Sequence, residues 1–140
     1  MNDRRPRLQA LLAIDAATCA AMGVLLVAGS DLVATLTRLP AQLLLWAGVS
    51  LLPIAAFMGV FSRARRVPQW AATLAVLGNL GWVVASVALP VAGIVQPNAL
   101  GWLFLIGQAV VVALLAILER QASVAVEGGR NARRGANVTP

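Results

Sequence analysis

Few side chains in this sequence could carry a proton, bind a ligand or take part in catalysis, and the strongest candidate lies inside an apolar segment. Asp15 is the only charged residue within four long apolar runs of the sequence. A carboxyl group near the centre of a membrane span costs about 2.5–3.5 kcal/mol, so it needs a partner or a function. Asp15 could carry a proton or bind a cationic ligand, and a helix–helix hydrogen bond is the structural alternative.

Uncharged polar residues near the middle of other runs extend this candidate site. Asn79 is the expected hydrogen-bond partner of Asp15. Trp82 and Ser86 follow Asn79 at i+3 and i+7, so they share its helical face. The candidate ligand-binding residues are Asp15, Asn79, Trp82, Ser86 and Gln108.

Two hydroxyl side chains complete a predicted polar layer across the bundle. Thr18 and Ser50 lie near the middle of their runs, at a depth similar to that of Asp15. Such a layer either specifies helix packing through hydrogen bonds or forms a binding site at the membrane midplane. The sequence leaves both alternatives open.

The sequence lacks the residues that several classes of catalytic and metal-binding site require. The chain has no histidine, and Cys19 is its single cysteine. These counts argue against a disulfide, a redox cysteine pair and a histidine- or cysteine-based metal site. We therefore predict a protein that is not an enzyme and has no cofactor or metal. A membrane enzyme acting on lipid or quinone would have only Asp15, Glu119 and Arg120 as candidates, and the last two are expected to end a helix at the interface.

The elements that carry these residues are predicted to be membrane-spanning helices. The chain is 60% hydrophobic and 11% charged, whereas soluble domains are roughly 45–50% apolar and about 25% charged. Each apolar run has about 21 residues, close to the ~20 that a helix needs to cross the hydrocarbon. The runs are Leu8–Ala28, Ala41–Phe61, Gln69–Leu89 and Asn98–Leu118. We expect an all-α, membrane-embedded four-helix bundle over residues 8–120, after an N-terminal segment at 1–7 and before a disordered tail at 121–140.

Arginine placement predicts the orientation. All 11 basic residues are arginines, and ten of them flank the runs at the two termini and in the middle loop. Only Arg38 lies on the other side. By the positive-inside rule, both termini are cytoplasmic in a bacterial inner membrane. A cleaved signal peptide is the alternative for the first run, but that run is too long and contains Asp15.

The pattern also resembles a group of small bacterial integral membrane proteins. The resemblance rests on Asp15 early in the first span, Asn79-x-x-Trp82-x-x-x-Ser86 in the third, and Pro97, Gly101 and Gln108 around the fourth. It covers residues 8–120 and implies a fold without an assigned activity. Small multidrug resistance transporters also carry an acidic residue in their first span, but they use Glu, are shorter and avoid strong charge bias. The quinone-reducing, disulfide-forming four-helix enzymes need paired cysteines.

These observations favour a small polytopic membrane protein with a structural or accessory role. The alternative is a small-molecule or proton-coupled transporter, or a ligand-binding protein, that uses Asp15 and the polar layer. The lipid bilayer is the expected partner, together with a second copy of the chain or another membrane protein. Nucleic acid is not expected, because the arginines flank apolar runs and do not form one basic face.

Overall fold

The chain folds into four helices and no strand within residues 4–136, the part that the computed structural model describes. The all-α prediction is confirmed, and all four helices are long and apolar enough to span a membrane. They are α1 (Arg4–Thr37), α2 (Ala41–Ser62), α3 (Gln69–Val91) and α4 (Ala99–Ala136).

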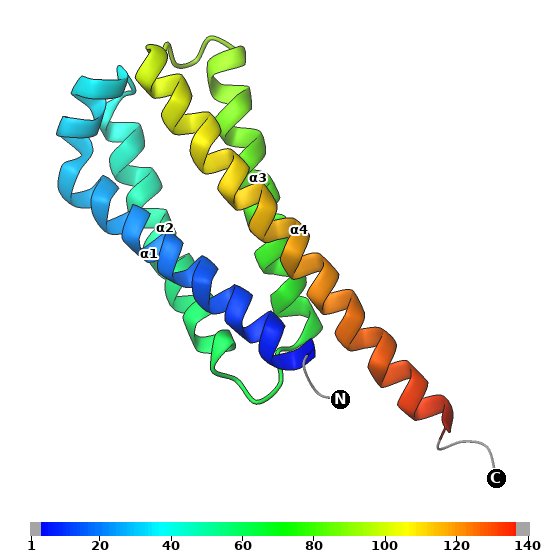
Figure 1. The fold of residues 1–140 in the computed structure, drawn as a ribbon. Coiled ribbons are helices and arrows are strands. Elements are labelled where there is room, and N and C mark those ends of the chain that lie inside the picture. The colour runs from blue at the N-terminus through cyan, green and yellow to red at the C-terminus, as the bar shows by residue number, and fades with distance from the viewer. Residues whose placement is uncertain (1–3, 137–140) are drawn as a thin grey trace.

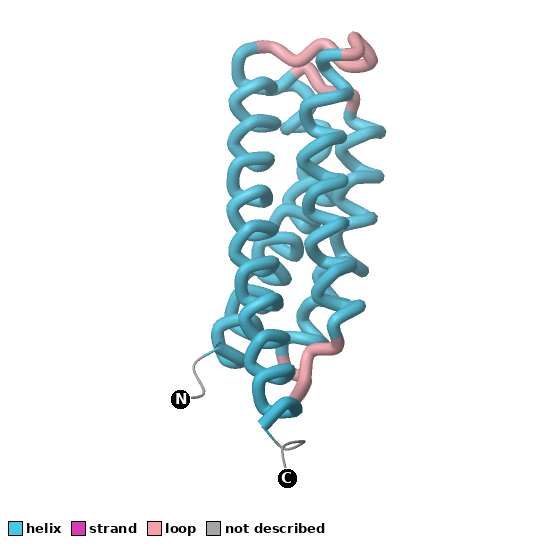
Figure 2. The backbone as a smooth tube through the Cα atoms, turned by 90° about the vertical axis from the view of Figure 1, so that its right-hand side faces the viewer, coloured by secondary structure: helices cyan, strands magenta, loops and turns pink. Residues whose placement is uncertain are grey.

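The helices form two antiparallel hairpins, α1 with α2 and α3 with α4 (Figure 1). The hairpins meet mainly through α1 and α4, and the ring of Trp70 on α3 also packs against Phe57 and Phe61 of α2. The smooth trace shows the helices running side by side along one axis, with loops gathered at the two ends (Figure 2). This pairing leaves space between the hairpins.

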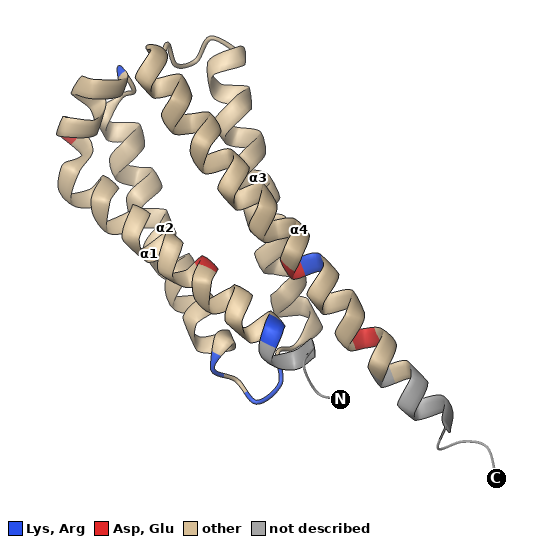
Figure 3. Ribbon diagram, viewed as in Figure 1, with Lys and Arg blue, Asp and Glu red and all other residues tan. Residues whose placement is uncertain are grey.

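Charge is concentrated at one end of the bundle. The ribbon is largely free of charged residues through its middle, whereas the loop between α2 and α3 carries arginines at the end where α1 begins (Figure 3). Many large apolar side chains are exposed along the helices, among them Val60, Val84 and Leu103. Soluble monomers rarely expose continuous apolar surface, so the surface of the fold is suited to lipid.

The first helix is longer than the sequence predicts. The sequence predicts a break after Ala28, but α1 continues to Thr37. Gly29 has non-helical backbone angles (φ −122°, ψ 19°) inside this helix. A local kink therefore replaces the predicted end of the span. The helix stops at Arg38, whose φ of 58° is the left-handed conformation common just after helix C-termini.

The last helix is also longer. The sequence predicts its end at Leu118 and a disordered tail from residue 121, but α4 continues to Ala136. The tail prediction is therefore wrong for residues 121–136, and residues 137–140 lie outside the described part. Packing explains the difference, because Glu119 and Ala122 are both buried and continue the inward face of α4 beyond Leu118.

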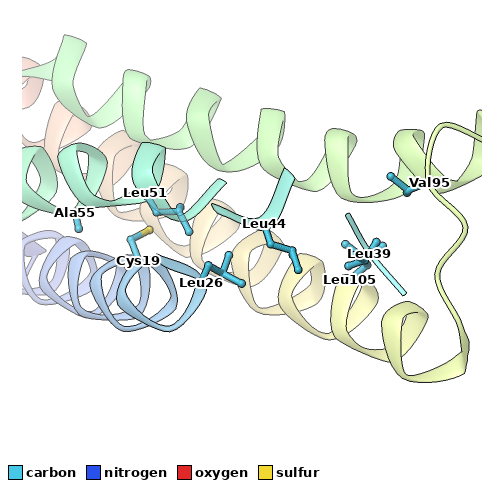
Figure 4. Close-up of a cluster of buried hydrophobic side chains, with 8 residues drawn as sticks. All are labelled: Cys19, Leu26, Leu39, Leu44, Leu51, Ala55, Val95 and Leu105. Atoms are coloured by element: carbon cyan, nitrogen blue, oxygen red, sulfur yellow. The ribbon is translucent and has the colours of Figure 1, made fainter. Parts of the chain in front are cut away.

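Two apolar clusters hold the hairpins together. The larger joins residues of α1, α2 and α4 with the α1–α2 and α3–α4 loops, which we name the outer loops because they lie at the end of the bundle away from the start of α1 (Figure 1). Figure 4 shows its members: Cys19, Leu26, Leu39, Leu44, Leu51, Ala55, Val95 and Leu105. The smaller lies nearer the start of α1 and contains Leu8, Leu12, Ala16, Met58, Ala75 and Ala122. Along α1, Asp15 lies between Leu12 of the smaller cluster and Cys19 of the larger one.

Candidate functional site

Asp15 lies at the centre of a buried polar cluster. Its side chain is fully buried, with 0% exposure. The Asn79 amide donates a hydrogen bond from Nδ2 to Asp15 Oδ2 at 2.7 Å. The Cys19 thiol, one turn along α1, donates to Asp15 Oδ1 at 3.6 Å. The predicted Asp15–Asn79 pairing between α1 and α3 is therefore confirmed.

A second carboxyl group, from α4, completes the cluster. Glu119 is also fully buried at 0% exposure. Asn79 Nδ2 lies 3.4 Å from Glu119 Oε2, so one amide nitrogen faces both carboxyl groups. Because both groups face this one nitrogen, the Asp15 and Glu119 carboxyl groups lie close to each other. Three helices therefore meet at one polar point, which we call the carboxyl pair: Asp15 and Glu119 bridged by Asn79.

The carboxyl pair is not neutralised by a basic side chain. Within the described residues, neither Asp15 nor Glu119 forms an ion pair, and Arg120, the neighbour of Glu119, is exposed. Glu119 Oε1 is buried and has no hydrogen-bond partner in the described part of the chain. Two carboxyl groups thus share a single amide donor and one thiol. A buried charge without a partner of opposite charge costs much free energy. Unlike a buried salt bridge, the carboxyl pair has no basic partner among the described residues.

A cavity of about 330 Å³ adjoins the carboxyl pair between the two hairpins. All four helices contribute to its wall, which is mostly apolar. Asn79 and Cys19, the two side chains that bond to Asp15, line this cavity, as do Trp82, Phe104 and Gln108. We call it the inner cavity. Any change in the hydrogen bonds of Asp15 therefore acts on groups that form the cavity wall.

A second cavity of about 330 Å³ lies toward the outer loops. Trp82, Phe104 and Gln108 line both cavities, so they form the partition between them. Ser86 lines this outer cavity, and its hydroxyl donates to the Trp82 carbonyl of its own helix at 2.8 Å. Gln108 Oε1 is buried without a hydrogen-bond partner among residues 4–136.

The predicted polar layer does not form as one unit. Thr18 and Ser50 donate to carbonyl oxygens of their own helices, those of Ile14 and Ala47. Gln108 precedes Glu119 by eleven residues, about 16 Å along α4, and therefore lies at a different depth from the carboxyl pair. Hydroxyls in a helix readily satisfy themselves on the preceding turn, which explains why they do not reach the cluster.

Glu119 is the residue of the candidate site that the sequence pattern misplaces. The pattern predicts that Glu119 and Arg120 end a helix at the interface, since charged residues normally mark the end of a span. A usable signal is the alternating spacing of four and three residues along α4, which places one stripe of side chains on the inner face. That stripe comprises Gly101, Leu105, Gln108, Val112, Leu115, Glu119 and Ala122.

At the outer end, Asn98 ties the two hairpins together. Its Nδ2 donates to the Leu36 carbonyl at 2.8 Å, and its backbone N–H donates to the Thr37 carbonyl at 3.1 Å. Its Oδ1 accepts the Gly101 N–H at 2.8 Å, capping the start of α4. Asn98 thus links the end of α1 to the start of α4.

Comparisons with protein-family models, with curated proteins and with solved structures give no significant match. The resemblance to a group of small bacterial membrane proteins therefore stays a prediction. Among the described residues, no group of three or more His, Cys, Asp or Glu side chains is arranged to hold a metal ion. The functional argument consequently rests on the carboxyl pair and the cavities beside it.

Proposed function

We propose that the chain is a small, non-enzymatic membrane carrier that binds a proton at the carboxyl pair and a small solute in the cavity beside it. The single observation that carries this proposal is the burial of Asp15 and Glu119 close to each other, with Asn79 and Cys19 as their only side-chain donors among the described residues. The proposal thus selects the transport alternative of the sequence over the accessory role.

A shared proton is the simplest way to accommodate the pair. Two ionised carboxylates in contact repel each other strongly where the dielectric constant is low. A carboxyl group donates a hydrogen bond only when it is protonated. One proton between Asp15 and Glu119 supplies that donor and removes one of the two charges. The Asn79 amide then stabilises the remaining negative charge.

Proton and solute are linked in this proposal through the cavity wall. Asn79 and Cys19 contact Asp15 on one side and line the inner cavity on the other. Loss of the proton strengthens the attraction of both donors to the carboxyl pair. Their positions in the wall therefore depend on protonation, and a solute that changes these positions changes proton affinity in return.

For orientation, we propose that both termini face the cytoplasm of a bacterial inner membrane. The support is the placement of ten of 11 arginines at the termini and in the loop between α2 and α3. The start of α1 and that loop lie at the same end of the bundle (Figure 3). Proton and solute would then be exchanged between the periplasmic and cytoplasmic ends.

An accessory role in the assembly of another membrane protein is the second candidate. The C-terminal part of α4 favours it, because this helix extends to Ala136, past the ends of the other helices (Figure 1). A projecting helix end offers a partner a surface outside the bundle. Stoichiometric co-purification of a second membrane protein would favour this candidate.

Charge movement after a pH jump tests the proposal. The purified chain is reconstituted in liposomes on a solid-supported electrode, and the external pH is stepped. We expect a transient current in the wild type, because protons enter a buried site, and its loss in Asp15→Asn and Glu119→Gln. Thr35→Val, an exposed position whose hydroxyl bonds only to its own helix, is the matched control. A wild-type current equal to that of empty liposomes would refute the proposal.

A further inference from the structure

The end of the bundle where α1 begins carries four exposed arginines that take no part in the carboxyl pair. Arg63, Arg65 and Arg66 lie in the loop between α2 and α3, and Arg7 lies near the start of α1 (Figure 3). Their guanidinium groups form no ion pair within the described residues, and their one hydrogen bond there runs from Arg63 Nη1 to the Gly59 carbonyl at 3.3 Å. We call this surface the arginine end, and it carries positive charge that suits an anionic partner.

The loop of the arginine end is held in place by hydrogen bonds. Gln9 Nε2, on α1, donates to the Ala64 carbonyl at 2.6 Å. The backbone N–H groups of Arg63 and Ala64 donate to the carbonyl oxygens of Val60 and Phe61, each at 3.2 Å. The loop therefore continues the last turn of α2 and is tied to α1. A surface that is already ordered loses less conformational freedom when it binds a partner.

Three aromatic rings adjoin the arginine end and bridge α2 and α3. The ring centroids of Phe57 and Phe61 are 4.7 Å apart, and those of Phe61 and Trp70 are 5.3 Å apart. Trp70 remains 59% exposed although it makes these contacts. Exposed tryptophans of membrane proteins lie at the depth of the lipid headgroups. The neighbouring arginines are therefore expected at the level of the lipid phosphates.

An exposed apolar strip continues along α3 from Trp70 toward the middle of the bundle. Leu74 and Leu77 follow Trp70 at i+4 and i+7, so they share its helical face. Their side chains are 53% and 59% exposed. The strip from Trp70 to Leu77 is about 10 Å long. Basic groups, an interfacial ring and an apolar strip thus follow one another in the order of the phosphate, the glycerol region and the acyl chain of a phospholipid.

We propose that the arginine end binds an anionic phospholipid, with its phosphate on Arg65 and Arg66 and an acyl chain along Trp70 and Leu74. Guanidinium groups form paired hydrogen bonds with phosphate oxygens. A zwitterionic headgroup brings its own cation, which the arginines repel, so the site selects a headgroup with net negative charge. The positive-inside rule accounts for the presence of arginines here; the fixed loop and the adjoining apolar strip are what favour a bound lipid over a soluble phosphate. This proposal goes beyond the proposed function and does not depend on it.

Quenching of Trp70 fluorescence by brominated lipids tests the proposal. The full chain with Trp46→Phe, Trp82→Phe and Trp102→Phe keeps Trp70 as its single tryptophan. It is reconstituted in liposomes of phosphatidylcholine and phosphatidylglycerol with identical acyl chains, and one of the two lipids is brominated. The quenching at each lipid ratio gives the relative affinity of the two lipids for the surroundings of Trp70. We expect a preference for phosphatidylglycerol of at least about fivefold, which corresponds to the attraction of one basic residue to an anionic membrane surface.

Substitutions in the same single-tryptophan chain locate the site. Arg65→Gln with Arg66→Gln should bring the preference close to one, and the two side chains are exposed, so no buried contact is lost. Arg65→Lys with Arg66→Lys keeps the charge and should retain a preference between those of the glutamine variant and the parent chain. Arg38→Gln, at an exposed position among the outer loops, is the matched control and should keep the parent preference. Both lipids are present in both leaflets, so the orientation of the chain does not affect the result.

Three outcomes would overturn the proposal. The first is equal quenching by the two brominated lipids in the parent chain. The second is an unchanged preference in the glutamine variant, or a lysine variant as unselective as the glutamine one. The third is an equal loss in Arg38→Gln, because the net charge of the chain and not the arginine end would then set the preference. The pH-jump current is not part of this measurement, so the lipid site and the proposed function are tested independently.

Discussion

Replacement of Asn79 is the most informative perturbation of this fold. Its amide nitrogen is the only side-chain group in the described part of the chain that faces both members of the carboxyl pair, at 2.7 Å from Asp15 and 3.4 Å from Glu119. Asn79→Leu keeps the number and branching of the side-chain heavy atoms while removing the donor. The effect on the free energy of unfolding therefore reports the hydrogen bonds and not a new cavity.

The expected loss in the free energy of unfolding follows from the two contacts of the Asn79 amide. A hydrogen bond to a charged group is worth about 1.5–3 kcal/mol, while interhelical hydrogen bonds in membranes average about 0.6 and reach about 1.7 kcal/mol. The contact to Glu119 is long and adds little. Since loss of the donor leaves a buried charge unsolvated, we expect Asn79→Leu to lower the free energy of unfolding by about 2 kcal/mol.

Ser86→Ala is the matched control on the same helix. Ser86 is 6% exposed, against 5% for Asn79. Its hydroxyl bonds only to the Trp82 carbonyl one turn earlier, and this bond also forms in the separated helix. Its loss should cost less than about 0.5 kcal/mol. Detergent-induced unfolding in mixed micelles, followed by tryptophan fluorescence, measures both variants. Equal destabilisation by the two substitutions would refute the reasoning.

Other positions give independent predictions. A methyl group on Gly48 would lie 2.8 Å from the Leu26 Cβ of α1, so Gly48→Ala should destabilise the α1–α2 hairpin by about 1–3 kcal/mol. Gly59→Ala has no neighbour closer than 3.9 Å and should be nearly neutral in the same unfolding assay; similar losses would contradict this account of the packing. Asn98→Ala removes two side-chain bonds at the outer loops and should raise hydrogen exchange there, with little change at the opposite end. Uniform exchange along the chain would contradict a local role for Asn98.

The parts of the fold that follow from solvent and chain length are predictable from the sequence. Apolar runs of about 21 residues can only be helices in lipid, so the residues alone are enough to recognise four spans. The Asp15–Asn79 pairing is also predictable, because polar groups of similar depth seek each other where water is absent. Turns marked by Pro40 and Pro68 predict the helix starts closely, at Ala41 and Gln69.

The remaining features depend on tertiary packing. A hydropathy pattern ends a span at the first charged residue, so it assigns Glu119 to an interface although the position of this residue on α4 faces Asp15 across the bundle. Gly29 similarly indicates a break, whereas neighbouring apolar residues let the helix continue through a kink. Cavities cannot be predicted from one sequence, because they depend on how far the hairpins separate.

Infrared spectroscopy of the protonated carboxyl group tests the central claim most directly. A carboxylic acid C=O stretch is resolved from that of an ionised carboxylate, and exposed carboxyl groups are ionised at neutral pH. The purified protein in lipid should show one such acid band at neutral pH, shifted in Asp15→Asn and in Glu119→Gln and absent from the double variant. A wild-type spectrum with ionised carboxylates alone would contradict the shared proton between Asp15 and Glu119.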